Sequence, residues 1–576
     1  MNLIITKKFK NRNKNNLFIG SWCLNKKNFY ENEFRNNNIA KYHWDNKRKL
    51  NKDLNYLLKL HDQYLKFLKE KLNKHHNLRF TKKFYTIILT RWLWKFLVFY
   101  YDRWEQINLV KRNKQITTCT INEYNNIKFI PISTRHFCTN LILQNDWNEW
   151  VFSEIIKEKK FLKCRKIKKK IKFQQGVSQS KKNFSLIILI NSFLSLFSSK
   201  KFVSQNIILP KISKILFSVF NKQFMFSYQT DLVDLIQNEN KIDLSTRKKI
   251  FYNNSKNSDF VNFINKQIIY NFPKIFLENF KDNLNFITKL HLPKKPKLIL
   301  TSLDHHFNDI FNLYAALSRE VGSKYYIFQH GGSYGLAANF IAEKLDIKIS
   351  DKFFTWGWKD KSNKVVPFFF QKFNSLKKNI FSKKKKSGIV IPTTEFKLEP
   401  GDIAGGRPRH CNQVNDYINN INYIISNLDS EIKKNVTIKY LETRNISYVK
   451  DSIFHKFPNL NFLCSKKNTY SHNFRLSIET LNSTGFLDAM FLNQPVLLLL
   501  DKNYSPIRSN AKNIINNLKK AKIVHNSSNS ISGFLNSNYS DINRWWSSKK
   551  VQDTRKIFCK NYLRSSKSLI FDINEL

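Results

Sequence analysis

The chain has 576 residues and a mass of 68.7 kDa, a length typical of two or three domains. Its hydrophobic fraction of 42% and its 50 Phe exclude a wholly disordered chain, because disordered sequences are poor in aromatic residues. Only 13 Gly and 12 Pro are present, which excludes collagen-like or proline-rich material.

The charge is strongly positive, with 99 Lys and Arg against 42 Asp and Glu, a net +57. Such an excess is compatible with a nucleic acid, an anionic membrane surface or an acidic substrate as partner. A dedicated nucleic-acid-binding protein would concentrate these residues in a stripe or tail, whereas here they run along the whole chain. We therefore predict a solvated basic surface and no specific nucleic acid.

Seven cysteines are present, and none forms a Cys-x-x-Cys pair. The spacing predicts no zinc site and no disulfide framework, which favours a reduced, cytoplasmic protein. Two apolar runs, 87–101 and 184–197, are shorter than the ~20 residues that a membrane-spanning helix needs. We predict that both are buried core helices. Peripheral contact with an anionic inner membrane stays open, because Lys and Arg are attracted to anionic lipid.

The first 290 residues are predicted to be mainly helical. After a short strand at 17–23, leucines and tyrosines recur at three- and four-residue spacing over 54–72, and a bulky aromatic helix follows over 84–104. The basic run 157–172 is typical of a solvated helix end or loop. We interpret residues 42–290 as a large helical insertion.

The pattern changes near residue 297, where apolar strands begin to alternate with helices. Strands are predicted at 297–302, 324–328 and 352–356, with helices at 307–319 and 337–345 between them. After a lysine-rich linker at 377–387 the alternation resumes. The strands predicted there are 388–392, 436–440, 461–464, 477–481, 496–500 and 522–525, and the helices are 412–428, 486–492, 507–518 and 552–566.

This alternation predicts an α/β fold with two Rossmann-like domains. The first domain, 1–380, carries the helical insertion and is expected to bind the acceptor. The second, 381–576, is expected to bind a nucleotide donor. The role of the helical insertion stays open.

The first candidate site follows the strand at 324–328 and reads Gln329-His330-Gly331-Gly332. Ligands sit outside the carboxyl ends of parallel strands, and glycines let a backbone turn tightly near a ligand. An imidazole there can accept a proton or contact a phosphate near neutral pH. Asp304, which follows the preceding strand, is a second candidate catalytic residue. A plain turn capped by His330 is the alternative.

The second candidate site is Ser483-Thr484-Gly485, with Asp488 one turn later. A helix that begins here would offer unpaired backbone N–H groups and a partial positive charge to a phosphate. Asp488 could then accept a hydrogen bond from ribose, and Arg444 could contact phosphate. An ordinary N-cap without any ligand is the alternative. We expect His330 and 483–485 to face one another across a cleft between the two domains.

Several motifs, spread over nearly the whole chain, together resemble a family of bacterial transferases encoded in O-antigen and other surface-polysaccharide biosynthesis regions. They are Phe18-Ile-Gly-Ser-Trp-Cys23, Tyr42-His-Trp-Asp45, Asp102-Arg-Trp104, Asn145-Asp-Trp-Asn148, Gln329-His-Gly-Gly332, Asp351-Lys-Phe-Phe-Thr-Trp-Gly-Trp358 and Ser483-Thr-Gly485. Such proteins look like metal-independent GT-B glycosyltransferases. Asp488 departs from the pattern of that superfold, in which Glu is common at this position.

The resemblance implies transfer of a sugar, or a related unit, from a nucleotide-activated donor to a polysaccharide or lipid-linked acceptor. No cofactor is expected beyond the donor substrate. Three alternatives stay open: a nucleotide-sugar epimerase of the same fold, a basic nucleic-acid-binding protein and a scaffold at the membrane surface. The sugar, the nucleotide, the acceptor, the stereochemical outcome and the oligomeric state are not specified by the sequence.

Overall fold

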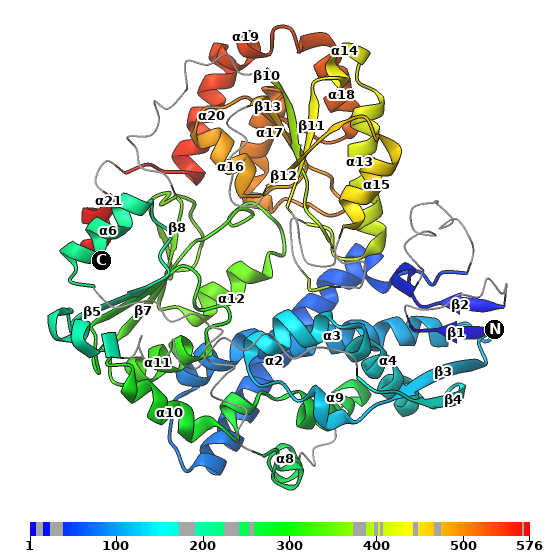
Figure 1. Ribbon diagram of the computed structural model, residues 1–576, viewed down its shortest axis with the longest axis vertical. Coiled ribbons are helices and arrows are strands. Elements are labelled where there is room, and N and C mark those ends of the chain that lie inside the picture. Colours follow the sequence, from blue (N-terminus) through cyan, green and yellow to red (C-terminus); the bar gives the residue numbers. More distant parts are fainter. Residues whose placement is uncertain are drawn as a thin grey trace. The chain divides into compact units, whose positions relative to one another are not determined.

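Figure 1 shows the computed structural model of the chain. The structure describes residues 1–6, 15–23, 38–171, 189–190, 192–223, 241–252, 258–372, 387–396, 401–403, 407–441, 447–465, 474–566 and 569–576. The described chain divides into two compact units. Unit 1 comprises Met1–Ile207, Phe217–Ile327 and Lys348–Asp351, and unit 2 comprises Ile208–Leu216, Phe328–Ile347 and Lys352–Leu576. The predicted domain boundary at residue 380 and most of the predicted linker lie outside the described residues.

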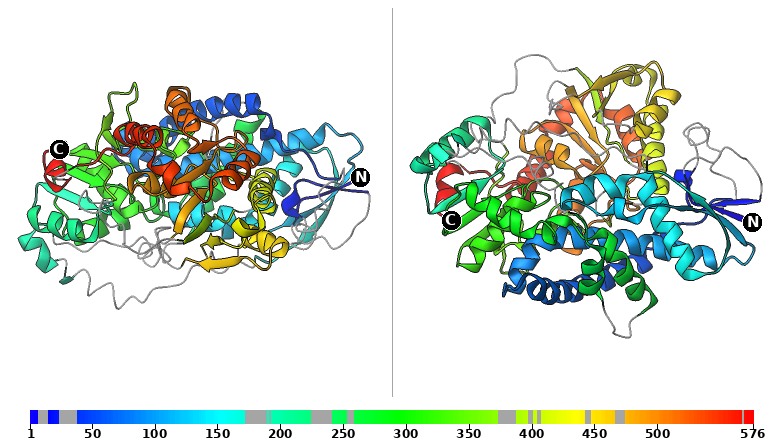
Figure 2. Two further views of the ribbon diagram at one scale, coloured as in Figure 1. Left: turned by 90° about the horizontal axis from the view of Figure 1, so that it is seen from above. Right: turned by 60° about the horizontal axis from the view of Figure 1, so that its bottom comes forward.

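Two long helices, α2 (Lys47–His76) and α3 (Lys82–Lys111), lie side by side in unit 1 (Figures 1 and 2). The leucine stripe of α2 is buried, and the helix ends at Asn77, whose φ of 55° is left-handed. Helix α3 carries large apolar side chains on every side, so neighbouring elements cover almost all of it. Both predicted helices are confirmed, including the buried run at 87–101.

A four-stranded parallel sheet in unit 1 has the order β2-β1-β3-β4. Its strands are β1 (Asn2–Ile4), β2 (Asn16–Phe18), β3 (Thr118–Glu123) and β4 (Lys163–Lys168). The prediction of a helix end or loop at 157–172 is therefore wrong over β4. Because β4 is an edge strand with mostly exposed side chains, its sequence is lysine-rich and lacks apolar alternation.

A five-stranded sheet has the order β5-β6-β7-β8-β9, and the pairs β5–β6, β6–β7 and β8–β9 are parallel. The strands are β5 (Phe202–Gln205), β6 (Leu298–Thr301), β7 (Lys324–Phe328), β8 (Lys352–Thr355) and β9 (Val365–Pro367). The predicted strands at β6, β7 and β8 are confirmed. Other α-helices labelled among the described residues up to β9 are α4 (Asn145–Lys159), α6 (Lys211–Phe220), α8 (Leu244–Phe251), α9 (Asp259–Asn271), α10 (Phe280–Lys289), α11 (Asp309–Glu320) and α12 (Ile341–Ile349).

A six-stranded parallel sheet in unit 2 has the order β12-β11-β10-β13-β14-β15. Its strands are β10 (Ser387–Pro392), β11 (Val436–Tyr440), β12 (Asn461–Cys464), β13 (Phe474–Glu479), β14 (Val496–Leu499) and β15 (Val524–His525). All six correspond to predicted strands, and β11 and β12 agree residue for residue.

Helices cover both faces of this six-stranded sheet (Figure 1). One group consists of α13 (Cys411–Ser426), α15 (Tyr448–Lys456) and α18 (Ser528–Asn538), and the other of α16 (Thr484–Phe491), α17 (Lys512–Lys520) and α20 (Lys549–Tyr562). The shorter helices of this region are α14 (Ser430–Lys433), α19 (Ile542–Ser547) and α21 (Leu569–Asn574). The second group packs on β14 in one apolar cluster that includes Phe486, Leu498 and Phe558.

These pairings confirm the predicted α/β fold with two Rossmann-like sheets and a large helical region, which also contains β3, β4 and β5. One predicted core helix is wrong. Of the run 184–197, residues 189–190 and 192–197 are described and helical, but Leu196 is 76% exposed and Leu189 70% exposed. Among the described residues, no helix combines the length and apolar character needed to cross a bilayer.

Candidate active site

The six-stranded sheet has a topological switch point between β10 and β13. From β10 the chain builds β11 and β12 on one side, and then returns to build β13, β14 and β15 on the other. Open α/β sheets bind ligands outside the carboxyl ends of the strands at such a point. The buried hydroxyl of Tyr417 joins the two loops there, accepting hydrogen bonds from the Thr394 amide at 3.3 Å and the Thr480 hydroxyl at 3.0 Å.

Helix α16 begins in the loop that leaves β13. Ser483 is its N-cap, and the Ser483 side chain accepts a hydrogen bond from the Gly485 amide at 3.3 Å. Ser483, Thr484 and Gly485 are partly exposed. A Cβ added to Gly485 would lie 2.7 Å from Glu479 Oε2, so a larger residue here would displace the Glu479 carboxylate. The helix N-terminus predicted from the sequence is thus present, and its first residues are partly exposed.

Two buried carboxyl groups lie behind this N-terminus. The pKa of Glu479, the last residue of β13, is raised to about 7, chiefly by burial and with a smaller contribution from Asp488, against the opposing effects of Ser477 and Lys439. Burial likewise raises the pKa of Asp488 to about 6, opposed by the ion pair with Lys372. Sequence reasoning missed Glu479, although an acidic residue within a predicted apolar strand is a usable signal.

The loop after β7 is held by its first residue. The buried Gln329 side chain donates to the Gly331 carbonyl at 2.9 Å and accepts from the Trp356 amide at 3.0 Å and from Trp358 Nε1 at 2.8 Å. Two of the motifs quoted above, 329–332 and 351–358, therefore meet through Gln329. Gln329 therefore fixes the conformation of the loop. The next residue, His330, is partly exposed.

A hydrogen-bond chain runs from His330 to Asp346. The Tyr334 hydroxyl donates to Asp346 Oδ2 at 2.6 Å and lies 3.2 Å from His330 Nδ1. Because the Tyr334 hydroxyl donates its hydrogen bond to Asp346, its oxygen can accept a hydrogen bond from Nδ1–H of His330. Nε2 would then be the basic nitrogen of His330. Tyr334 and Asp346 are buried, and sequence reasoning missed both of them.

The two predicted site loops are in direct contact within unit 2. The Gly332 amide donates to the Thr484 hydroxyl at 3.0 Å, and the Ser333 hydroxyl donates to the Asn482 carbonyl at 2.6 Å. A Cβ on Gly332 would lie 2.4 Å from the Ser483 carbonyl carbon, whereas a Cβ on Gly331 would meet only Thr484 Oγ1, at 3.7 Å. The sequence predicted that His330 and 483–485 face one another across a cleft between two domains, whereas in the structure their loops pack directly on one another within one unit.

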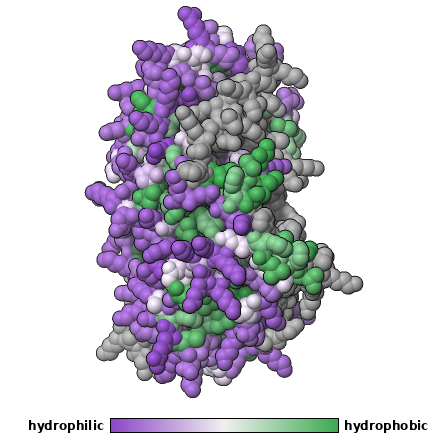
Figure 3. All heavy atoms as spheres, turned by 90° about the vertical axis from the view of Figure 1, so that its left-hand side faces the viewer, coloured by the Kyte–Doolittle hydropathy of each residue, from purple (hydrophilic) through white to green (hydrophobic). Residues whose placement is uncertain are grey.

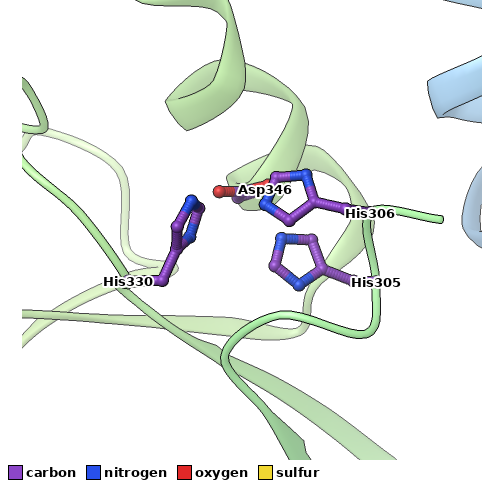
Figure 4. A group of neighbouring side chains, drawn as sticks. All are labelled: His305, His306, His330 and Asp346. Atoms are coloured by element: carbon purple, nitrogen blue, oxygen red, sulfur yellow. The ribbon is translucent and has the colours of Figure 1, made fainter. Parts of the chain in front are cut away.

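Figure 4 shows His330 and Asp346 with His305 and His306, which follow β6. Each of the four offers one ligand atom, and these atoms lie within 4.8 Å of one another. Imidazole nitrogens and a carboxylate oxygen are ligands that zinc and related metals accept. The expectation that no metal binds rested on the absence of a Cys-x-x-Cys pair and on the resemblance to metal-independent GT-B enzymes, and it stays a prediction.

The other predicted site residues have different surroundings. Asp304 follows β6 and is buried, and it accepts a hydrogen bond from Asn206 Nδ2 at 2.6 Å. Asp488 is also buried and paired with Lys372, so its predicted contact with ribose would require that ion pair to open. Arg444 lies outside the described residues. The roles assigned to these three residues stay predictions.

The N-terminal motifs converge on a second buried network, in unit 1. Asp102 accepts hydrogen bonds from Tyr42, from His43 Nε2 at 3.1 Å and from Arg103 Nη1 at 2.8 Å. Arg103 in turn donates to Asn148 Oδ1 at 2.6 Å. Burial alone would raise the pKa of Asp102, but Arg103 and the donors around it outweigh burial and lower the pKa.

Comparison with known proteins gives distant structural likenesses. UDP-GlcNAc 2-epimerase from Neisseria meningitidis, bound to UDP-GlcNAc, matches 80% of this chain and 99% of its own, with 12% identity and a TM-score of 0.33. A mutant O-GlcNAc transferase from Thermobaculum terrenum matches 56% and 58%, with 8% identity and a TM-score of 0.29. These values are too low to assign an activity. No curated protein matches the chain.

The family comparison covers nearly the whole sequence. The model of the LIC12162 family transferases matches residues 1–574, a span that includes both Rossmann-like sheets, the loop at His330 and the N-terminus of α16. The predicted membership of a transferase family is thereby confirmed, and this chain belongs to the LIC12162 family of transferases.

Proposed function

We propose that this transferase moves a sugar, or a related unit, from a nucleotide-activated donor to a polysaccharide or lipid-linked acceptor, as a GT-B-type glycosyltransferase of bacterial surface-polysaccharide (O-antigen) biosynthesis. One observation carries the proposal: the histidine loop packs against the partly exposed N-terminus of α16, and that helix starts at the topological switch point of a parallel sheet. A proton acceptor and a phosphate-binding element then share one site.

The donor half of the site is the N-terminus of α16. Its backbone amides and the Ser483 and Thr484 hydroxyls would receive the donor phosphates, with the helix dipole favouring their negative charge. Hydrogen-bond donors that are already in place stabilise the charge that develops on the leaving phosphate without reorganising. Donor binding through these groups needs no metal ion and no cofactor.

The histidine loop supplies the base. In the proposed step the acceptor hydroxyl attacks the donor carbon, its oxygen–carbon bond forms, and its proton passes to His330 Nε2. The carbon–oxygen bond to the phosphate breaks, and the nucleotide leaves with that electron pair. Tyr334 and Asp346 would keep Nδ1 protonated and Nε2 free to accept.

A binding series tests the donor half. Thermal shift with uridine, UMP and UDP, and with the matching cytidine and guanosine series, should give the largest rise in melting temperature with a phosphorylated nucleotide. Thr484→Val removes a hydroxyl donor and should lower the shift with the nucleotide that binds best. The exposed serine of another N-cap provides the control, Ser258→Ala, and should leave the shift unchanged. Equal shifts for nucleoside and nucleotide would contradict phosphate binding at α16.

A turnover assay tests the reaction. Labelled nucleotide sugars are incubated with the chain and with acceptor lipid or polysaccharide extracts, and the products are separated with and without acceptor. Transfer requires an acceptor, whereas an altered nucleotide sugar formed without one would identify an epimerase. His330→Ala should abolish transfer and keep nucleotide binding. The same assay with a chelator added shows whether a metal bound at His305, His306, His330 and Asp346 contributes to turnover. If catalysis is independent of metal, the chelator should leave turnover unchanged.

A further inference from the structure

Two helices near β5 turn their apolar faces outward. In the helical residues 189–190 and 192–197, the exposed large apolar residues stand at i, i+4, i+7 and i+8, which is one helical face. That face is exposed: Leu189 by 70%, Phe193 by 62%, Leu196 by 76% and Phe197 by 58%. Such a stripe ordinarily faces the core of a protein, so its exposure indicates that something outside the chain covers it.

Helix α6 repeats the same arrangement. Its exposed apolar residues stand at i, i+3, i+4, i+7 and i+8, and they are Ile212 (74% exposed), Ile215 (64%), Leu216 (43%), Val219 (55%) and Phe220 (70%). The opposite side of the helix carries Phe217 and Ser213, which are buried. The exposed stripe is therefore the larger apolar face of α6, and the helix is fixed to the protein by its smaller face.

The two helices are joined to one another near β5. The Ser199 amide donates to the Lys222 carbonyl at 2.9 Å, Gln223 Nε2 donates to the Phe202 carbonyl at 2.6 Å, and the rings of Phe202 and Phe217 lie 5.7 Å apart. Figure 3 views the side on which α6 lies in Figure 1 and shows apolar surface exposed there. We call the nine exposed apolar residues of the two helices the apolar face.

The segment of sequence that carries the apolar face contains only positive charges. Residues 159–230 contain 16 Lys and Arg and no Asp or Glu. Within the described part of this segment, Lys211 and Lys214 lie on α6, Lys200, Lys201 and Lys222 lie beyond the helix ends, and all five are exposed. An apolar stripe bordered by lysines is the pattern of a helix that lies in the interface of an anionic bilayer.

We propose that the apolar face docks this transferase onto an anionic lipid bilayer, with the two helices parallel to the membrane plane and their lysines at the headgroups. A second copy of the chain is a poorer occupant, because it would bring the same acid-free, lysine-rich segment against itself. The proposal goes beyond the proposed function and does not depend on it, since docking needs neither nucleotide nor acceptor.

Vesicle co-sedimentation of the full chain tests this proposal. Wild-type protein should pellet with vesicles of phosphatidylcholine and phosphatidylglycerol, and less with phosphatidylcholine alone or at high salt. Leu196→Ser with Phe220→Ser should lower the partition coefficient by about a hundredfold, because each of the two inserted side chains contributes about a factor of ten. Lys211→Gln with Lys214→Gln should lower it by about fivefold per lysine, and only on the anionic vesicles.

Matched variants remove apolar and basic residues from other surfaces. Phe454 and Ile557 are 50% and 52% exposed, so Phe454→Ser with Ile557→Ser should leave vesicle binding unchanged, as should Lys549→Gln with Lys550→Gln. Thermal melts establish that each variant is folded. Wild-type protein that stays in the supernatant at low salt would overturn the proposal. So would a dimer that dissociates when Leu196 and Phe220 are replaced, which would make a second copy the occupant.

Discussion

The Gly332 amide donates a hydrogen bond to the Thr484 hydroxyl at 3.0 Å, across 152 residues of sequence. This bond joins the loop of the proposed base to the first turn of the proposed phosphate-binding helix. Because Gly332 packs directly on the Ser483–Thr484 peptide, the two halves of the site cannot shift independently of one another. Small displacements of catalytic groups are costly to turnover, so this contact has a consequence for activity.

Replacing Gly332→Ala should therefore damage both the fold and the reaction. The added methyl group would lie 2.4 Å from the Ser483 carbonyl carbon and 2.6 Å from the Thr484 amide nitrogen, so backbone must move. We expect the free energy of unfolding, measured with urea, to fall by about 1–3 kcal/mol. We also expect turnover to fall, and by a larger fraction than the free energy of unfolding. Gly331→Ala is the control, because its methyl group would meet only the Thr484 hydroxyl, at 3.7 Å. Equal effects of the two variants would contradict the packing argument.

Tyr334→Phe should change how turnover depends on pH. The variant removes the acceptor for His330 Nδ1–H, so His330 should become less basic, turnover should fall by about tenfold to a hundredfold, and the acid limb of the pH–rate profile should move to lower pH. Tyr314→Phe removes a comparable buried hydroxyl, which donates to the Pro293 carbonyl at 2.8 Å. That control should lose stability without moving the limb. If the acid limb of the pH–rate profile did not move in Tyr334→Phe, the hydrogen-bond chain from His330 to Asp346 would have no role in setting the basicity of His330.

Glu479 should make the stability of the protein fall as the pH rises toward neutrality. Its pKa is raised by burial to about 7 from an ordinary value of 4.5, so folding favours the protonated form. The stabilisation is complete below about pH 4.5 and is lost as the pH rises through about 7, on the order of 3 kcal/mol in all.

Glu479→Gln isolates this effect. The amide keeps an acceptor for the Ser477 hydroxyl but cannot ionise, so the variant should match the wild type near pH 4 and exceed its free energy of unfolding at pH 8. Urea titrations at several pH values measure the difference. Glu431→Gln, at an exposed helix position, should give no such trend. A pH-independent difference between Glu479→Gln and the wild type would contradict a buried, protonated Glu479.

The sequence was most informative where a short apolar run is bounded by polar residues. Strands β7, β11 and β12 agree with their predictions because such runs are typical of parallel strands, and this holds even for β12, which lies at the edge of its sheet. Strand β4 was not predicted, because its side chains are mostly exposed and its sequence lacks apolar alternation. The run 184–197 was misinterpreted for another reason: periodicity identifies an apolar helix face but does not specify what covers it.

The residues of the candidate site also fall into two groups, those that a local sequence pattern predicts and those that it does not. The two glycine-containing loops follow predicted strands, so their residues could be named in advance. Tyr334, Asp346 and Glu479 could not, because their importance lies in contacts that exist only once the chain is folded: a hydroxyl between an imidazole and a carboxylate, and an acid closed in behind a helix N-terminus.

Asp102 should prove far more important to stability than an exposed ion pair of the same charge type. Its carboxylate is fully buried between Arg103 and His43, so Asp102→Asn leaves the Arg103 guanidinium buried without its counter-charge. We expect a loss of about 3–5 kcal/mol in the free energy of unfolding. Asp62→Asn breaks an ion pair with Lys348 that is half exposed at Asp62, and should cost about 0–1 kcal/mol. Urea unfolding of both variants measures the contrast, and a loss below about 1 kcal/mol for Asp102→Asn would mean that Asn148 and solvent compensate Arg103 without the carboxylate.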